Sequence, residues 1–206
     1  MGTRDSVEAA FKAILKDKPY RKVTVSEICA AAGVSRRAFY ENFDDKEAIV
    51  EWLFDKHVMK LMRDFHRVVS LEEAGILKDS NTLRMYQGLY AEREYYINLI
   101  GPLRGQDDTF IRVVTNAIYD FNMQHIPRLA TPSCEWRLDY TAYYFASSQA
   151  MFMQKWISDK MAIPPEQITS LYQSITMPFW DRVIKFQKGA NCTYLTTPGT
   201  SKYDES

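Results

Sequence analysis

Two adjacent arginines, Arg36 and Arg37, are the residues of this sequence best suited to recognise another molecule by hydrogen bonding. A guanidinium group is planar and donates two parallel hydrogen bonds, which match the O6 and N7 acceptors of guanine in the major groove of DNA. The pair follows Ser35, whose hydroxyl can cap a helix, so both arginines fall on the first turn of that helix. The alternative interpretation is an ordinary solvated helix face.

Two short helices joined by a tight turn are needed to position this arginine pair. Thr24 and Glu27 have the spacing of a capping box, which predicts a helix that begins after Thr24. The alanines at 30–32 are small enough for two helices to touch, and Gly33 tolerates the positive φ of a sharp turn. Ser35 then caps the second helix. This arrangement is a helix-turn-helix, in which the second helix enters the major groove of DNA.

The flanking sequence predicts further helices around this unit. A first helix is expected to end near Lys18, because Pro19 disfavours helical geometry in the residue before it. Asp44 and Glu47 repeat the capping-box spacing and predict a longer helix that reaches Val58. Apolar residues at helical spacing give the first helix its buried face and anchor the second helix of the pair: Val7, Ala10, Phe11, Ile14, Phe39 and Phe43.

One pattern in this region is specific enough to indicate a family. It leads from a threonine cap through Gly-Val-Ser to a Phe-Tyr-x-x-Phe-x-x-Lys segment, and its residues are Thr24, Ile28, Ala32, Gly33, Val34, Ser35, Phe39, Tyr40, Phe43 and Lys46. On these residues, the first quarter of the chain resembles the TetR family of one-component transcription regulators. Cys29 departs from the family pattern, in which alanine is common, but cysteine is also small.

The resemblance implies which residues meet DNA. Thr24, Tyr40 and Lys46 match positions that usually bind backbone phosphates, whereas Ser35 and the arginine pair match positions near bases. Asn42 is expected to join them. The alternatives are that Tyr40 covers the core and that Lys46 is a solvated residue of its first helical turn. The expected DNA-binding residues are Thr24, Ser35, Arg36, Arg37, Tyr40, Asn42 and Lys46.

The rest of the chain is expected to be helical as well, which makes the fold class all-α. Helices are predicted over 82–99, 108–125 and 138–160 and from about Glu166, and Pro178 should kink or split the last one. We expect an N-terminal helix-turn-helix DNA-binding domain, a larger effector-binding and dimerisation domain, and a mobile tail. The expected boundaries of these three parts are 1–48, 49–188 and 189–206.

The predicted helix over 138–160 carries a row of alanines four residues apart, which lets two helices approach closely. The resemblance implies that the last two helices pair with those of a second copy, and a two-fold dimer suits a palindromic operator. The alternative is an internal helix of a monomer. The expected interface residues are Ala142, Ala146, Ala150, Met153, Ile157, Ile168, Leu171 and Ile175.

Aromatic residues are frequent in the C-terminal two thirds of the chain. Such residues can line a pocket for a small apolar or aromatic molecule, and the resemblance implies an effector pocket in this domain. The alternative is that aromatic residues at helical spacing form a plain hydrophobic core. The expected pocket residues are Tyr86, Tyr90, Tyr95, Phe110, Tyr119 and Tyr144.

Composition limits the other possibilities. The chain is 46% hydrophobic and 25% charged, as in ordinary globular proteins, and it has neither a membrane-length apolar stretch nor a secretory signal. We therefore expect a cytoplasmic protein. Its 3 cysteines are scattered, which argues against a disulfide framework or zinc site, and no metal or cofactor is expected. The net charge is zero, but the first 43 residues contain eight basic and five acidic side chains, an excess that suits phosphates.

The motifs also separate the possible functions. A Gly-rich phosphate loop, a GxSxG elbow and an HExxH motif are all missing from the sequence, which argues against an enzyme. The resemblance implies a homodimeric, ligand-responsive regulator, in the commoner mode a repressor released from a palindromic operator by a small molecule. The alternative is a coactivator of the same fold that acts through protein–protein contacts.

Overall fold

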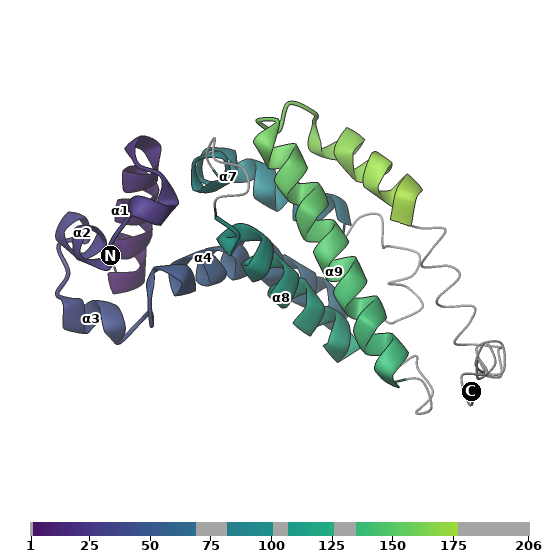
Figure 1. Ribbon diagram of the computed structural model, residues 1–206, viewed down its shortest axis with the longest axis horizontal. Helices are drawn as coiled ribbons and strands as arrows, with labels where there is room; N and C mark the ends of the chain where they lie inside the picture. The colour runs from purple at the N-terminus through teal and green to yellow at the C-terminus, as the bar shows by residue number, and fades with distance from the viewer. Residues whose placement is uncertain (1, 69–81, 101–106, 126–134, 177–206) are drawn as a thin grey trace, which may run out of the picture.

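The computed structural model describes residues 2–68, 82–100, 107–125 and 135–176 (Figure 1). Every regular element among these residues is a helix, and none of these helices is long and apolar enough to cross a bilayer. The elements are α1 (Thr3–Asp17), η1 (Tyr20–Lys22), α2 (Val25–Ala32), α3 (Arg36–Tyr40), α4 (Lys46–Phe54), η2 (Asp55–Met59), α5 (Lys60–Val68), a helix at 82–91, α7 (Arg93–Ile100), α8 (Thr109–His125), α9 (Glu135–Ser158) and a helix at 165–176.

The three helices α1, α2 and α3 form a small N-terminal unit, which we call the head (residues 2–45); the rest is the body. Figure 1 shows the head at one end of the molecule, with α2 and α3 turned away from the body. The predicted apolar face of α1 is confirmed, because Val7, Ala10 and Phe11 are buried and Ile14 packs against the same core. The helix ends at Asp17, as the proline two residues later predicts.

A continuous helical segment connects the head to the body. It consists of α4, the π-helical turn η2 and α5, and its buried side chains include Ile49, Leu53, Phe54 and Val58. In the body, α8 packs along α9, and the helix at 165–176 returns across α9 (Figure 1). Helix 82–91 and α7 complete the core with Tyr86, Leu89, Tyr96 and Leu99, all buried. The all-α prediction is therefore confirmed.

Two predicted helix boundaries are corrected. The cap of α4 is Asp45 rather than Asp44, since its carboxylate accepts a hydrogen bond from the Ala48 N–H at 2.9 Å. The single helix expected over 82–99 is interrupted at Glu92, whose backbone N–H donates to the Leu89 carbonyl at 3.2 Å, three residues back. This is a tighter turn than the four-residue step of an α-helix, and it separates helix 82–91 from α7.

The later helices agree with the sequence in type and position. The helices expected over 108–125 and 138–160 correspond to α8 and α9, and the last helix begins at Pro165. Proline is favoured at a first helical position because its missing N–H would have no partner there. The expectations for Pro178 and for the tail at 189–206 lie outside the described residues.

Candidate nucleic-acid interface

The turn between α2 and α3 has the geometry that the sequence predicts. Gly33 adopts φ 65° and ψ 30°, in the left-handed region that glycine enters without strain. The Val34 N–H then donates to the Cys29 carbonyl at 3.0 Å, which closes the end of α2. Ser35 caps α3, because its hydroxyl accepts from the Ala38 N–H at 3.1 Å. The turn therefore fixes the angle at which α3 leaves α2.

The arginine pair lies on the exposed first turn of α3. The Arg36 guanidinium donates to the Ser26 hydroxyl, and Arg37 Nε donates to Glu41 Oε1 at 3.1 Å. The Arg37 side chain is 90% exposed, so this ion pair is weak and can be exchanged for another partner. On the opposite face of the same helix, Phe39 is fully buried. The helix thus has a fixed inner face and a cationic outer face.

Thr24 is engaged in the capping box expected from the sequence. Its hydroxyl accepts from the Glu27 N–H at 3.3 Å, and Glu27 Oε2 accepts in return from the Thr24 N–H at 2.9 Å. Glu27 also pairs with Lys18, and these hydrogen bonds, first the one from Lys18 and then those from Thr24, lower the pKa of Glu27 to about 2. Thr24 itself is exposed at the start of α2.

Tyr40 and Asn42, at the end of α3, differ in their exposure. The Tyr40 side chain is 54% exposed and packs edge-on against Phe39, with ring centres 5.4 Å apart. Asn42 is half-buried, and its Nδ2 donates to the Ala38 carbonyl at 2.9 Å. The Tyr40 ring therefore reaches solvent, whereas the Asn42 amide closes the last turn of the helix.

Lys46 begins α4, and its ammonium points back into the head. Its Nζ donates to the carbonyl oxygens of Tyr20 and Val23 at 3.0 and 3.1 Å, and it lies 3.4 Å from the Arg21 carbonyl. An ammonium group has three donors, so these carbonyls occupy the donors that a phosphate would need. Burial lowers the pKa of Lys46. Lys46 therefore holds the linker between α1 and α2 in the chain without DNA, and its expected contact with a phosphate stays a prediction.

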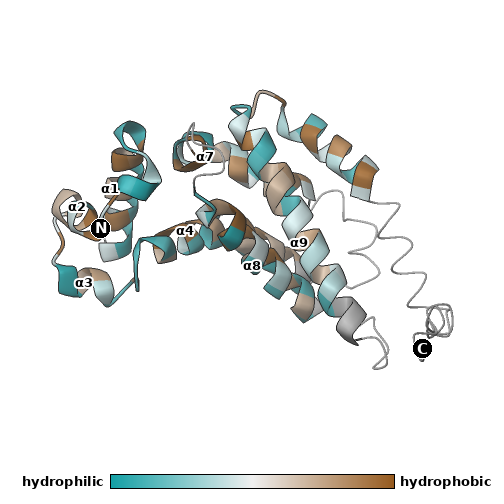
Figure 2. Cartoon of the chain, in the orientation of Figure 1, coloured by the Kyte–Doolittle hydropathy of each residue, from teal (hydrophilic) through white to brown (hydrophobic). Residues whose placement is uncertain are grey.

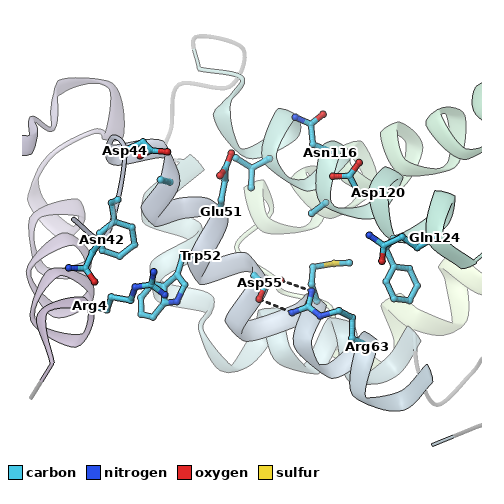
Figure 3. A pocket seen from close by; sticks show the side chains of 16 residues that line it. Arg4, Asn42, Asp44, Glu51, Trp52, Asp55, Arg63, Asn116, Asp120 and Gln124 are labelled. Carbon is cyan, nitrogen blue, oxygen red and sulfur yellow. Dashed lines mark hydrogen bonds and ion pairs between the residues drawn. The ribbon is translucent and has the colours of Figure 1, made fainter. Parts of the chain in front are cut away.

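A groove of about 690 Å³ lies where the head, α4 and α8 meet (Figure 3). Its wall near the head contains Arg4, whose guanidinium lies 5.6 Å from the Phe43 ring centre and 5.9 Å from that of Trp52. Farther along, Arg63 pairs with Asp55 at 2.6 Å. The lining is mostly polar. No local sequence pattern marks this groove, because segments far apart in the chain form it.

The six aromatic residues expected around one pocket differ in burial and surroundings among the described residues. Tyr86, Tyr95 and Phe110 are buried in the core of the body. Tyr90 stacks on Trp156, whereas the remaining two, Tyr119 and Tyr144, lie on α8 and α9. Tyr144 is 59% exposed. Tyr90 and Tyr95 line a cavity of about 550 Å³, together with Lys12 and Glu92. An effector pocket in the body stays a prediction.

The eight residues expected at a dimer interface fall into two groups. Six of them have exposures of 4% or less within the chain itself: Ala142, Ala146, Ala150, Met153, Ile157 and Ile168. The alanine row is therefore buried within the protomer, where small side chains let α9 pack closely. The expected interface itself stays a prediction. Leu171 and Ile175 are 48% and 60% exposed, and they lie on the outer face of the last helix.

Comparison with known proteins assigns both parts of the chain. Residues 8–53 match the family described as "Bacterial regulatory proteins, tetR family". Residues 79–177 match a second family, described as "Transcriptional regulator C-terminal region". The first match covers the head with the start of the connecting helix, and the second covers most of the described body.

Individual relatives agree in fold. The "HTH-type dhaKLM operon transcriptional activator DhaS" of Lactococcus lactis subsp. lactis (strain IL1403) is 29% identical over 62 residues, which are 30% of this chain and 33% of that protein. The match thus spans about a third of the curated relative. The solved "Dihydroxyacetone kinase operon activator DhaS" superposes with a TM-score of 0.52 at 17% identity, over 87% of this chain and 97% of the other.

A second solved structure, a TetR transcriptional regulator from Streptococcus agalactiae 2603V, superposes with a TM-score of 0.54 at 18% identity. It covers 84% of this chain and 92% of the other. At these identities the superpositions bear on the fold, and both agree with a helix-turn-helix head on a larger helical body. The chain belongs to the TetR family of bacterial regulatory proteins, which are transcription regulators and not enzymes.

Proposed function

We propose that the protein binds a palindromic operator as a homodimer and reads bases with the first turn of α3. The observation that carries this proposal is the contrast within that helix. Arg36 and Arg37 are exposed beyond the Ser35 cap, whereas Phe39 is fully buried and fixes the helix to the head. A fixed helix that presents two guanidinium groups can place them against guanine edges in the major groove.

Three exposed groups support the arginines in this proposal. Thr24 and Ser35 are the exposed caps of α2 and α3, and a phosphate at Thr24 would take over hydrogen bonds that Glu27 now accepts. Tyr40 is exposed one helical turn after Arg36 and can donate its hydroxyl to the backbone. DNA binding would replace the contacts of Arg36 with Ser26 and of Arg37 with Glu41 by contacts with bases or phosphates.

The proposed dimer interface is the outer face of α9 and of the last helix. Large apolar side chains are exposed there, and Figure 2 shows hydrophobic turns on the last helix. Met151 is 48% exposed, and Leu171 and Ile175 form a stripe four residues apart. A second copy related by a two-fold axis would cover the same stripe on both chains, and it would supply the second recognition helix that a palindrome requires.

Control by a small effector is part of the same proposal. An effector that binds the body in one head orientation better than in another would shift the population of operator-competent dimers. The two recognition helices must reach adjacent major grooves, about 34 Å apart, so a small pivot of each head would release the operator. Relief of repression is the mode that we propose.

A second candidate function is activation through protein contacts. One observation favours it: the N-terminal half of α9 exposes Tyr140, Tyr143 and Tyr144 at 70%, 57% and 59%, and exposed tyrosines are frequent in protein interfaces. The curated relative named above is also described as a transcriptional activator. In this alternative the head is retained as a scaffold and the tyrosines contact a partner protein.

The experiment that tests DNA reading is selection of bound duplexes from a random pool at low salt. The native protein is expected to enrich a palindrome. The double variant Arg36→Ala, Arg37→Ala should not enrich it, since each bidentate arginine–guanine pair contributes about 1–3 kcal/mol of discrimination. A matched control, Arg67→Ala with Arg84→Ala, removes two exposed arginines from the body and should select the native site. Enrichment of no sequence by the native protein would favour the protein-binding alternative.

The dimer is tested by Ile175→Asp. Ile175 is the more exposed of the two residues of the apolar stripe, and a carboxylate there would have to be desolvated, so the dimer dissociation constant should rise about 30-fold or more in analytical ultracentrifugation. The control is Ser170→Asp, which adds the same charge at an exposed position on another face of the same helix. Equal dissociation constants for both variants would place the interface elsewhere.

A further inference from the structure

A chain of ion pairs crosses the boundary between head and body, away from the proposed DNA interface. Lys12 on α1 lies 2.7 Å from Glu8 Oε1 on its own helix and 2.7 Å from Glu92 Oε2 of the body. Lys56 on η2 lies 2.6 Å from the second oxygen of Glu8. Burial alone would lower the pKa of Lys12, but the hydrogen bonds that its ammonium donates to Glu8 and Glu92 raise it. The ammonium therefore stays charged between the two carboxylates.

Two backbone irregularities place Glu92 opposite Lys12. Glu92 lies in the turn between helix 82–91 and α7, and from there its carboxylate accepts a hydrogen bond from Lys12 of α1. The π-helical turn η2 lies directly beneath, and its residue His57 approaches Glu92 Oε1 to 3.9 Å through Nε2. π-Helical turns are rare and are frequently found at functional sites.

The ion pair between Lys12 and Glu92, which we call the bridge, is surrounded by aromatic contacts between α1 and α7. Phe11 of α1 packs against Tyr95 of α7, with ring centres 6.3 Å apart, and Lys12 Nζ lies 5.6 Å from the centre of the Tyr95 ring. A hydrogen-bonded ion pair restricts both the distance and the angle between its two groups. Apolar packing is less directional. Of these contacts, the one between Lys12 and Glu92 has the geometry to set the angle of α1 on the body.

We propose that Lys12 and Glu92 are positioning residues for DNA binding: their ion pair fixes the angle of the head on the body. It thereby sets the distance between the two α3 helices of a dimer. This inference rests on the proposed operator binding. Any displacement of helix 82–91 or α7 moves Glu92 and is transmitted to α1 through the same pair. The bridge is thus the contact by which the body controls the spacing of the heads.

The test combines Glu92→Gln, Lys12→Met and the double variant, each as the full-length protein. For the DNA site that the native protein selects, the affinity of each single variant should be about fivefold lower. A fivefold loss is near the upper end of what a partly exposed ion pair contributes. The double variant should be no weaker than either single variant, since the two residues act through one contact. Glu94→Gln, an exposed carboxylate two residues later on the first turn of α7, is the control and should bind as the native protein does.

A second readout separates positioning from general stability. In a selection from random duplexes, Glu92→Gln should accept a broader range of half-site spacings than the native protein, while the half-site sequence stays the same. An unchanged spacing preference, or additive losses in the double variant, would overturn the inference and leave operator binding intact.

The angle of the head can also be measured without DNA. Spin labels at Ala31 on α2 and Asp159 after α9, in a chain with its 3 cysteines replaced, report the distance between head and body. Glu92→Gln should broaden or shift this distance distribution, and Glu94→Gln should not. This measurement decides the inference even where no operator is selected, and identical distributions in all three proteins would refute it.

Discussion

Replacing Gly88 by alanine should lower the free energy of unfolding by about 2 kcal/mol, against the usual effect of this substitution in a helix. Gly88 lies within helix 82–91, where alanine is normally better than glycine by about 1 kcal/mol. Here, however, an added Cβ would overlap the backbone carbonyl oxygen of His57. Backbone atoms cannot rotate away as a side chain does, so helix 82–91 and the η2 turn would have to separate.

Urea denaturation of Gly88→Ala and of Gln87→Ala measures this effect. Gln87 is exposed on the same helix, so its variant keeps alanine's helical propensity without the overlap and should retain nearly native stability. The sign of the change is decisive. A stabilised Gly88→Ala would show that the two segments are not in backbone contact in solution, and that the π-helical turn can move away from helix 82–91 at little cost.

The local sequence was sufficient to predict the head. The capping box of Thr24 and Glu27, the positive φ of Gly33 and the Ser35 cap all depend on residues a few positions apart, and the structure has each of them. The buried faces of α1 and α3 follow from spacing alone. Nearby residues determine these features, so periodicity and cap chemistry suffice to predict them.

The contacts between distant segments could not be predicted in the same way. Lys46 was expected to face a phosphate, but its ammonium meets carbonyls of residues more than 20 positions earlier. The bridge from Lys12 to Glu92 joins residues 80 positions apart, and neither residue belongs to a recognisable motif. Charge and exposure at a single position leave the partner undetermined, and only the packing of α1 on α7 selects it.

The alanine row shows a different kind of ambiguity. Small residues four apart predict a close helix contact, but the pattern is the same whether the neighbouring helix belongs to the same chain or to another. In the structure, Ala142, Ala146 and Ala150 are fully buried within the protomer. The surface that we propose for the second copy is defined instead by large apolar side chains that remain exposed. Which apolar residues remain exposed is known only once the chain is folded.

The pH dependence of stability should depend strongly on His57. Its side chain is 7% exposed, and burial lowers its pKa from 6.5 to about 4, with Lys12 and Lys56 also lowering it and Glu92 and Glu8 raising it. Its Nδ1 lies 3.2 Å from the Tyr96 hydroxyl. In the unfolded chain the imidazole takes up a proton near pH 6.5, whereas in the folded chain it stays neutral until about pH 4.

Stability must therefore fall as the pH decreases through this interval, because the unfolded chain binds one proton more than the folded chain does. Between pH 7.5 and pH 5 the loss from this residue alone should be about 2 kcal/mol. His57→Gln keeps a polar side chain beside Tyr96 but does not titrate. Its free energy of unfolding, measured in urea at the two pH values, should fall by about 2 kcal/mol less than that of the native protein.

Each protein is compared with itself at the two pH values, and only the two differences in free energy of unfolding are then compared. The contribution of the carboxylates is common to both differences and cancels. The control His66→Gln replaces a histidine elsewhere in the chain and tests whether losing any histidine has this effect. If the native protein and His57→Gln lost equal stability between the two pH values, protonated His57 would have to be accommodated in the fold. Glu92 is the carboxylate that could do so, since its Oε1 lies 3.9 Å from Nε2. That carboxylate would then be shared between His57 and Lys12, and acid would weaken the contact proposed to set the angle of the head.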